Sequence, residues 1–129
     1  MVRDALYPDR MRSTDSEALF LAIMGAGGAR DPLGATARVL AAVTRLLAGQ
    51  NGRLRFTSAL ADGRNLYAFR FAFNDQANTL YYRVVERGIL VVSEPLDDDR
   101  ALWKPVPEGR ALAIGGDGSF EVVPFMERY

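Results

Sequence analysis

The stretch "RLRFTSALADGRNLYAFRFAF", residues 53–73, decides the fold that this sequence predicts. It begins with a segment in which apolar and polar side chains alternate, the apolar face holding Leu54, Phe56 and Leu60. Such alternation indicates a β-strand, because successive side chains of a strand point to opposite faces. The turn signal Asp62-Gly63 then leads into a second strand. The stretch therefore predicts an antiparallel hairpin.

The second strand of this hairpin is apolar on both faces. One face carries only aromatic side chains, which are those of Tyr67, Phe69, Phe71 and Phe73. A strand that is apolar on both sides is typical of a sheet covered on both sides. Because the chain has no net charge, we interpret the aromatic face as core and not as a platform on which nucleic-acid bases stack.

Further strands are expected after the hairpin. Their sequences are "TLYYRVV", "ILVVSE", "RALAIG" and "SFEVVPF". The last two are joined by Asp117-Gly118, so "GGDG" is interpreted as a turn between strands and not as a phosphate loop. Trp103 is expected to pin the irregular segment before "RALAIG" to the sheet. The segment "ILVV" is again apolar on both faces, which suits a sheet covered on both sides.

Two helices are expected before the hairpin. The first runs from about Asp15 to Met24, with Leu19, Phe20 and Ile23 on one face. The second is opened by a capping aspartate and a first-turn proline, ends at "GQNG" and has the apolar stripe Leu33, Ala37, Leu40, Val43 and Leu47.

The order of these elements defines the fold class. It is α+β, with two helices followed by about six antiparallel strands. We expect a single domain over residues 1–129, in which residues 1–12 are a connecting segment. The two helices can cover only one sheet face. No other predicted element covers the second apolar face.

The composition excludes several classes of function. Sixteen basic residues balance sixteen acidic ones, which gives no electrostatic case for binding nucleic acid or an anionic membrane. The 129 residues contain no cysteine and no histidine, so they cannot form a disulfide, a thiolate or imidazole metal site, or a Ser-His-Asp or Cys-His arrangement. No apolar run approaches the roughly 20 residues that span a bilayer, and "MVRDALYPDR" lacks the apolar core of a signal peptide. We expect a cytoplasmic protein without a cofactor.

Two acidic stretches are candidate sites. Asp97–Asp99 offer three carboxylates to a hard cation, but they lack the spacing and glycine of a calcium loop, so a solvated loop and no metal site is expected. "TDSE", Thr14–Glu17, fits a capping box in which the first and last residues satisfy each other's backbone amides. Asp15 complements the helix dipole there. Alternatively, Asp15 projects from the helix start to bind a cationic group such as an α-ammonium, although the residues alone favour the cap.

In their order along the chain, these segments resemble the C-terminal half of class II glutamine amidotransferases, the N-terminal-nucleophile hydrolase kind. The segments that carry the resemblance are "TDSEALFLAIM", "DPLGATARVLAAV", "LRFTSALADGRNLYAFRF", "TLYYR", "VVSEPLDDD", "WKPVPEG" and "VVPF". The most similar group is the small stand-alone type that includes the ergothioneine-pathway γ-glutamyl hydrolases. The resemblance covers roughly Arg12 to Phe125. "TDSE" alone is a weak motif, whereas the ordered set with "SEPLD" and "VPEG" is fairly specific.

The resemblance implies a four-layer αββα sandwich, of which this chain forms half. It also implies that Asp15 binds the α-ammonium of glutamine. In that family the nucleophile is a cysteine directly after the initiator methionine, and its own α-amino group serves as the base. Val2 occupies this position here, and the family's oxyanion-hole His-Asn-Gly segment and its carboxylate-binding arginine are also missing. No catalytic residue is therefore assigned.

These absences leave three interpretations open. The chain is a split subunit whose partner carries the cysteine, a truncated product, or a non-catalytic module that retains the scaffold for binding or dimerisation. The expected partner is accordingly a complementary cysteine-bearing half or a second copy of the chain. The expected small-molecule substrate is glutamine or a γ-glutamyl compound, and the residues do not identify an acceptor of the ammonia.

Overall fold

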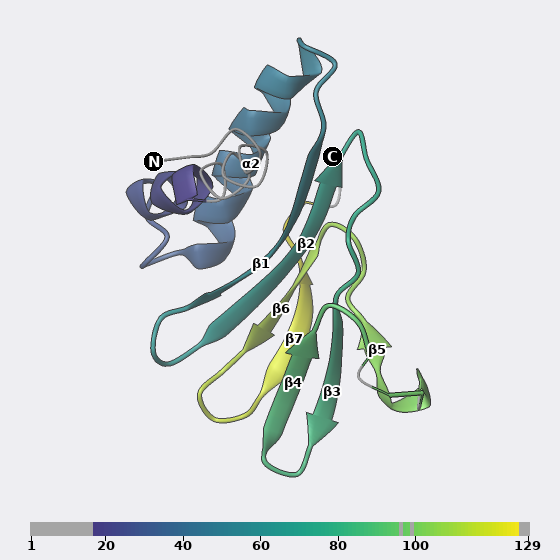
Figure 1. Ribbon diagram of the computed structural model, residues 1–129. Coiled ribbons are helices and arrows are strands. Elements are labelled where there is room, and N and C mark those ends of the chain that lie inside the picture. The colour runs from purple at the N-terminus through teal and green to yellow at the C-terminus, as the bar shows by residue number, and fades with distance from the viewer. Residues whose placement is uncertain (1–16, 96, 99, 127–129) are drawn as a thin grey trace, which may run out of the picture. The chain divides into compact units, whose positions relative to one another are not determined.

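The computed structural model describes residues 17–95, 97–98 and 100–126. It confirms the α+β class, because two helices precede seven strands that form two antiparallel sheets (Figure 1). Residues 17–25 are helical. The later elements are α2 (Pro32–Ala48), β1 (Leu54–Ala61), β2 (Leu66–Phe73), β3 (Tyr81–Val85), β4 (Gly88–Val92), the 3-10 helix η2 (Arg100–Leu102), β5 (Lys104–Pro105), β6 (Arg110–Ile114) and β7 (Phe120–Pro124). The strand that the sequence did not reveal is β5, which is too short to show an alternation of side chains.

The chain divides between Leu40 and Ala41 into two compact units. In the first unit the helix over residues 17–25 buries Ile23 completely. Phe20, which was expected on the same apolar face, is 48% exposed. Within the described part of the chain, no helix is long and apolar enough to cross a membrane.

The expected start and end of α2 are confirmed. The Gly34 amide donates a hydrogen bond of 3.0 Å to the carboxylate of Asp31, which is a capping contact. At the other end the Gly52 amide donates to the Leu47 carbonyl over 2.8 Å. Leu40 of the expected apolar stripe is fully buried, but the other buried positions of α2 lie outside that stripe, and they are Ala35, Thr36 and Thr44. The apolar pattern overlooked the threonines. Thr44 donates its hydroxyl proton to the Ala41 carbonyl of the same helix over 2.8 Å, which lets it tolerate burial. The buried Thr36 hydroxyl has no hydrogen-bond partner among the described residues.

The larger sheet has the strand order β1-β2-β6-β7. β1 and β2 pair in a register that sets Phe56 opposite Phe71, so aromatic side chains gather on one face. The Phe69 ring contacts those of Phe56 and Phe125, with ring centroids 6.2 and 5.0 Å apart. Phe69 and Phe71 are no more than 1% exposed, and so is Ala68 on the opposite face of β2. The expectation of a strand covered on both sides is therefore confirmed for β2.

The smaller sheet has the order β4-β3-β5 and packs on the other face of the larger one. The buried members of the core between the sheets are Ala68, Leu80, Val106 and Leu112. Tyr82 of β3 and Phe120 of β7 meet there edge to face, with ring centroids 5.6 Å apart. Arg70 of β2 donates to the carbonyls of Asn78 and Val106, each over 2.8 Å, and so ties the larger sheet to the segments that flank the smaller one. The two packed sheets are the ββ layers that the family resemblance implies.

Candidate functional site

The residue that the family resemblance singles out, Asp15, lies outside the described residues, and so does Thr14. Glu17, the last residue of "TDSE", is the first described residue, and it is helical and exposed. The assignment of Asp15 to the α-ammonium of a substrate, and the alternative of a helix cap, therefore both stay predictions.

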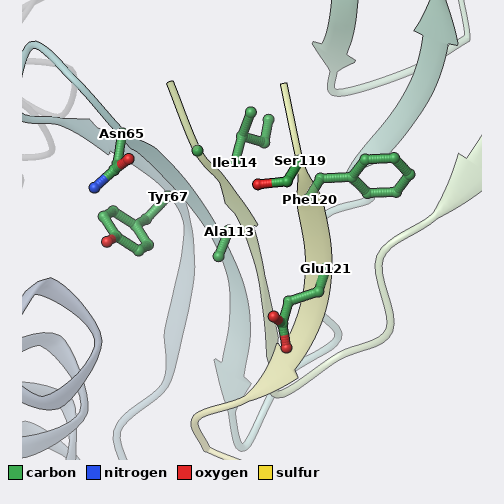
Figure 2. Close-up of a pocket in the computed structure, with 8 residues that line it drawn as sticks. Asn65, Tyr67, Ala113, Ile114, Ser119, Phe120 and Glu121 are labelled. Atoms are coloured by element: carbon green, nitrogen blue, oxygen red, sulfur yellow. The ribbon is translucent and has the colours of Figure 1, made fainter. Parts of the chain in front are cut away.

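A shallow hollow of about 220 Å³ lies where the β6–β7 hairpin meets the start of β2 (Figure 2). Its floor includes Ala113 and Gly115, because the strand register places Ala113 between Tyr67 of β2 and Glu121 of β7. Figure 2 shows Tyr67 on one side of Ala113 and Glu121 on the other. The other lining residues are Asn65, Ile114, Ser119 and Phe120. A small side chain between two long ones on the same sheet face thus produces the hollow.

The turn beside the hollow confirms the interpretation of "GGDG". Gly118 has a positive φ of 90°, which a residue with a side chain rarely adopts. Gly115 accepts a hydrogen bond of 3.0 Å from Gly118 and donates one of 2.8 Å to the Ser119 carbonyl. A Cβ atom added to Gly115 would lie 3.0 Å from both the Asp117 carboxylate and the Ser119 hydroxyl. A side chain at this position would therefore crowd the turn beside the hollow.

The chemistry of the hollow suits binding rather than acyl transfer. Glu121 supplies the one charged side chain of the lining, and Asn65, Tyr67 and Ser119 supply neutral hydrogen-bonding groups. The Ser119 hydroxyl donates to Asp117 over 2.6 Å. This hydrogen bond, with one from the Ser119 amide, lowers the pKa of the Asp117 carboxyl. A carboxylate with a lowered pKa is a weak base, so the arrangement does not activate Ser119 as a nucleophile.

Asp97, the first residue of the acidic stretch, takes part in a structural contact. One of its carboxylate oxygens accepts a hydrogen bond of 3.1 Å from the Trp103 indole, and the other pairs with Arg83 of β3 at 3.3 Å. The Arg83 guanidinium also lies 5.6 Å from the centre of the Trp103 ring. Trp103 is only 4% exposed. This confirms that Trp103 pins the irregular segment to the sheet, and it gives Asp97 a role that needs no metal.

Sequence reasoning missed the hollow because its walls come from strands distant in sequence. Tyr67 was assigned to the aromatic core, but it stands at the end of that face, where β6 offers only Ala113 beside it. The alternation of small residues in "ALAIGG" was the available signal. Using it would have required knowing that β2 and β6 are neighbours.

Comparison with solved structures finds a related protein. Over 97% of its length, this chain matches a glutamine aminotransferase class-II domain protein from Silicibacter pomeroyi, with a TM-score of 0.78 and 36% sequence identity. The match covers 57% of that protein's chain, so the present chain spans less than two thirds of it. No family model and no curated protein matches the sequence. The chain is thus related to a class II glutamine amidotransferase domain and has the fold of a part of that domain.

Proposed function

We propose that this chain is part of a class II glutamine amidotransferase or γ-glutamyl amide hydrolase. It supplies scaffold and the aspartate that binds the substrate α-ammonium, Asp15, but not the catalytic cysteine. The observation that carries the proposal is the 36% identity to the Silicibacter pomeroyi protein over 97% of this chain, against 57% of the other. Because the match extends over 97% of this chain, it takes in most of the two packed sheets, which supports a scaffold role.

The proposed reaction needs a nucleophile from outside these 129 residues, which contain no cysteine. In the family that the sequence resembles, a cysteine thiolate adds to the carbonyl carbon of the substrate amide. The C–N bond then breaks, ammonia leaves with the proton it gains, and water hydrolyses the remaining thioester. Acyl transfer of this kind requires both a nucleophile and groups that stabilise the oxyanion. The chain alone should therefore release no ammonia from glutamine.

A direct assay tests this expectation. Purified chain is incubated with glutamine, and ammonia is measured against a blank without protein. Turnover that persists after Ser13, Thr14 and Ser16 are all replaced by alanine would refute the assignment of the nucleophile to another polypeptide.

The role proposed for Asp15 rests on charge. A carboxylate at a helix start can accept a charge-assisted hydrogen bond from an α-ammonium, and such a bond contributes about 1.5–3 kcal/mol. With a cysteine-bearing partner present, Asp15→Ala should therefore lower kcat/KM roughly ten- to hundred-fold, at about 1.4 kcal/mol per factor of ten. Asp15→Asn keeps much of the shape but loses the charge, and it should be nearly as damaging.

Glu17→Ala is the matched control for this experiment. Glu17 belongs to the same capping motif, so its loss should lower the free energy of unfolding by roughly 1 kcal/mol and leave kcat/KM little changed. If Asp15→Asn instead retains full glutamine turnover while both variants melt earlier, Asp15 is only a cap and the substrate assignment is wrong.

A further inference from the structure

The strands β3 and β4 are apolar but poorly covered. No residue of either strand is fully buried, whereas β2 buries four of its eight residues. Val84 of β3 is 58% exposed and Leu90 of β4 is 42% exposed. The expectation that "ILVV" lies in a sheet covered on both sides is therefore not met by the described residues alone.

The two faces of this β3–β4 ribbon differ in what covers them. Tyr82 and Val91 pack into the core between the sheets, so the alternating residues Tyr81, Leu90 and Val92 lie on the outer face. Trp103 covers this outer face at the β5 side through its contact with Arg83. At the β4 side the outer face is left half-exposed.

The four sheet edges are not equally protected against pairing with another strand. Natural edge strands are protected by charged side chains, by proline or by being very short. β1 carries Arg55, β7 carries Glu121 and Pro124, and β5 consists of Lys104 and Pro105 alone. The fourth edge strand, β4, has the sequence "GILVV" and contains no charge and no proline.

An apolar, unprotected edge is a template for an added strand, because its free amides and carbonyls can pair with another chain. In the part of the chain that the structure describes, no strand pairs with this edge of β4. The related Silicibacter pomeroyi chain does contain further polypeptide, since the match covers 57% of it. That further polypeptide lies outside the match with these 129 residues.

We propose that β4 is the docking edge for a β-strand of the polypeptide that completes the amidotransferase fold. The added strand would extend the smaller sheet beyond β4, and the element attached to it would cover Tyr81, Leu90 and Val92. This inference rests on the proposed function for the identity of the occupant. The choice of β4 as the edge rests on burial and on the comparison of the four edges.

The test uses the segment of the Silicibacter pomeroyi protein that lies outside the match, co-expressed with the full 129-residue chain. Wild-type chain should co-purify with it, and hydrogen exchange should show new protection of the β4 amides. Leu90→Lys should raise the dissociation constant at least tenfold, because a buried ammonium loses its hydration. Leu46→Lys is the matched control, since Leu46 is 69% exposed on α2, and it should bind like the wild type.

Several results would overturn the proposal that β4 is a docking edge. Failure of the wild-type chain to co-purify, or protection confined to other strands, overturns the docking proposal. A homodimer that Leu90→Lys dissociates would show that a second copy occupies the edge, and it also overturns the proposal. In the chain alone, monomeric by sedimentation, β4 amides protected as strongly as those of β2 would mean that the edge is already covered.

The assays separate this inference from the proposed function. Glutamine hydrolysis by the complex without protection of β4 would leave the function standing and remove the docking edge. Docking at β4 without glutamine hydrolysis, in a complex whose cysteine is intact, would support the docking edge and contradict the proposed function.

Discussion

Arg70 is a side chain that links the larger sheet to the segments on both sides of the smaller sheet. It lies on β2, on the face between the sheets, and donates to the carbonyls of Asn78 and Val106, each over 2.8 Å. Val106 is completely buried, and its amide donates in turn to the Leu80 carbonyl over 2.8 Å. One guanidinium therefore fixes the segment before β3 and the segment after β5.

The expected cost of removing it follows from these two bonds. Hydrogen bonds to charged groups contribute about 1.5–3 kcal/mol each. The Asn78 contact is exposed, so its carbonyl can be rehydrated, whereas the contact to Val106 is partly buried. Arg70→Met, which keeps the apolar stem, should therefore lower the free energy of unfolding by about 2–4 kcal/mol. Arg70→Lys lacks the planar fork and should lose about half of that.

Urea unfolding followed by fluorescence measures these changes, because Trp103 is the only tryptophan and is 4% exposed beside the smaller sheet. Arg87→Met is the control, since Arg87 is exposed in the turn between β3 and β4 and should change stability by less than about 0.5 kcal/mol. If Arg70→Met unfolds at the same urea concentration as Arg87→Met, the guanidinium does not hold the sheets together and the reasoning fails.

Two further predictions concern acid and the helix cap. The pKa of Asp75 is lowered, first by its hydrogen bond from Arg55, and that of Asp117 by its bond from Ser119. Their stabilising effect should be complete above about pH 4, the ordinary aspartate pKa, and should fade as the pH falls toward the lowered values. Asp117→Asn should flatten the acid dependence of the urea midpoint, and an unchanged slope would contradict this. Asp31→Ala should cost about 0.5–2 kcal/mol in thermal or urea unfolding, whereas Asp31→Asn, which keeps the acceptor, should cost much less; equal losses would rule out the cap.

Features that depend on neighbouring residues could be read from the sequence. The hairpin around Asp62 is one example, because its carboxylate accepts bonds from the amides of Arg64 and Asn65, and Gly63 takes a positive φ of 87°. The cap at Asp31 and the turn at Gly118 are others of the same kind. In each case the residues that define the geometry lie within a few positions of one another, so local chemistry is sufficient.

Features that depend on distant partners could not be read in this way. The hydrogen bonds of Arg70 go to backbone carbonyls, which every residue has, so the sequence does not indicate these contacts. The hollow at Ala113 depends on the pairing of β2 with β6, and the uneven cover of β4 depends on which strands join which sheet. The family resemblance added the four-layer αββα sandwich and named glutamine as the expected ligand of Asp15, because neither follows from local pattern alone.

Along the chain, the strands of the smaller sheet lie between two strands of the larger sheet, and this has a consequence for the order of folding. β2 and β6 are neighbours, although β3, β4 and β5 come between them in the chain. The three hairpins can each form locally, but the seam between β2 and β6 must close a loop that holds an entire second sheet, and such non-local pairing is slow. The Phe69 ring can reach its partner Phe125 only after β7 has been made, because Phe125 directly follows that strand. Until then the aromatic face of the first hairpin lacks the cover of Phe125, and apolar surface that is exposed during folding favours aggregation.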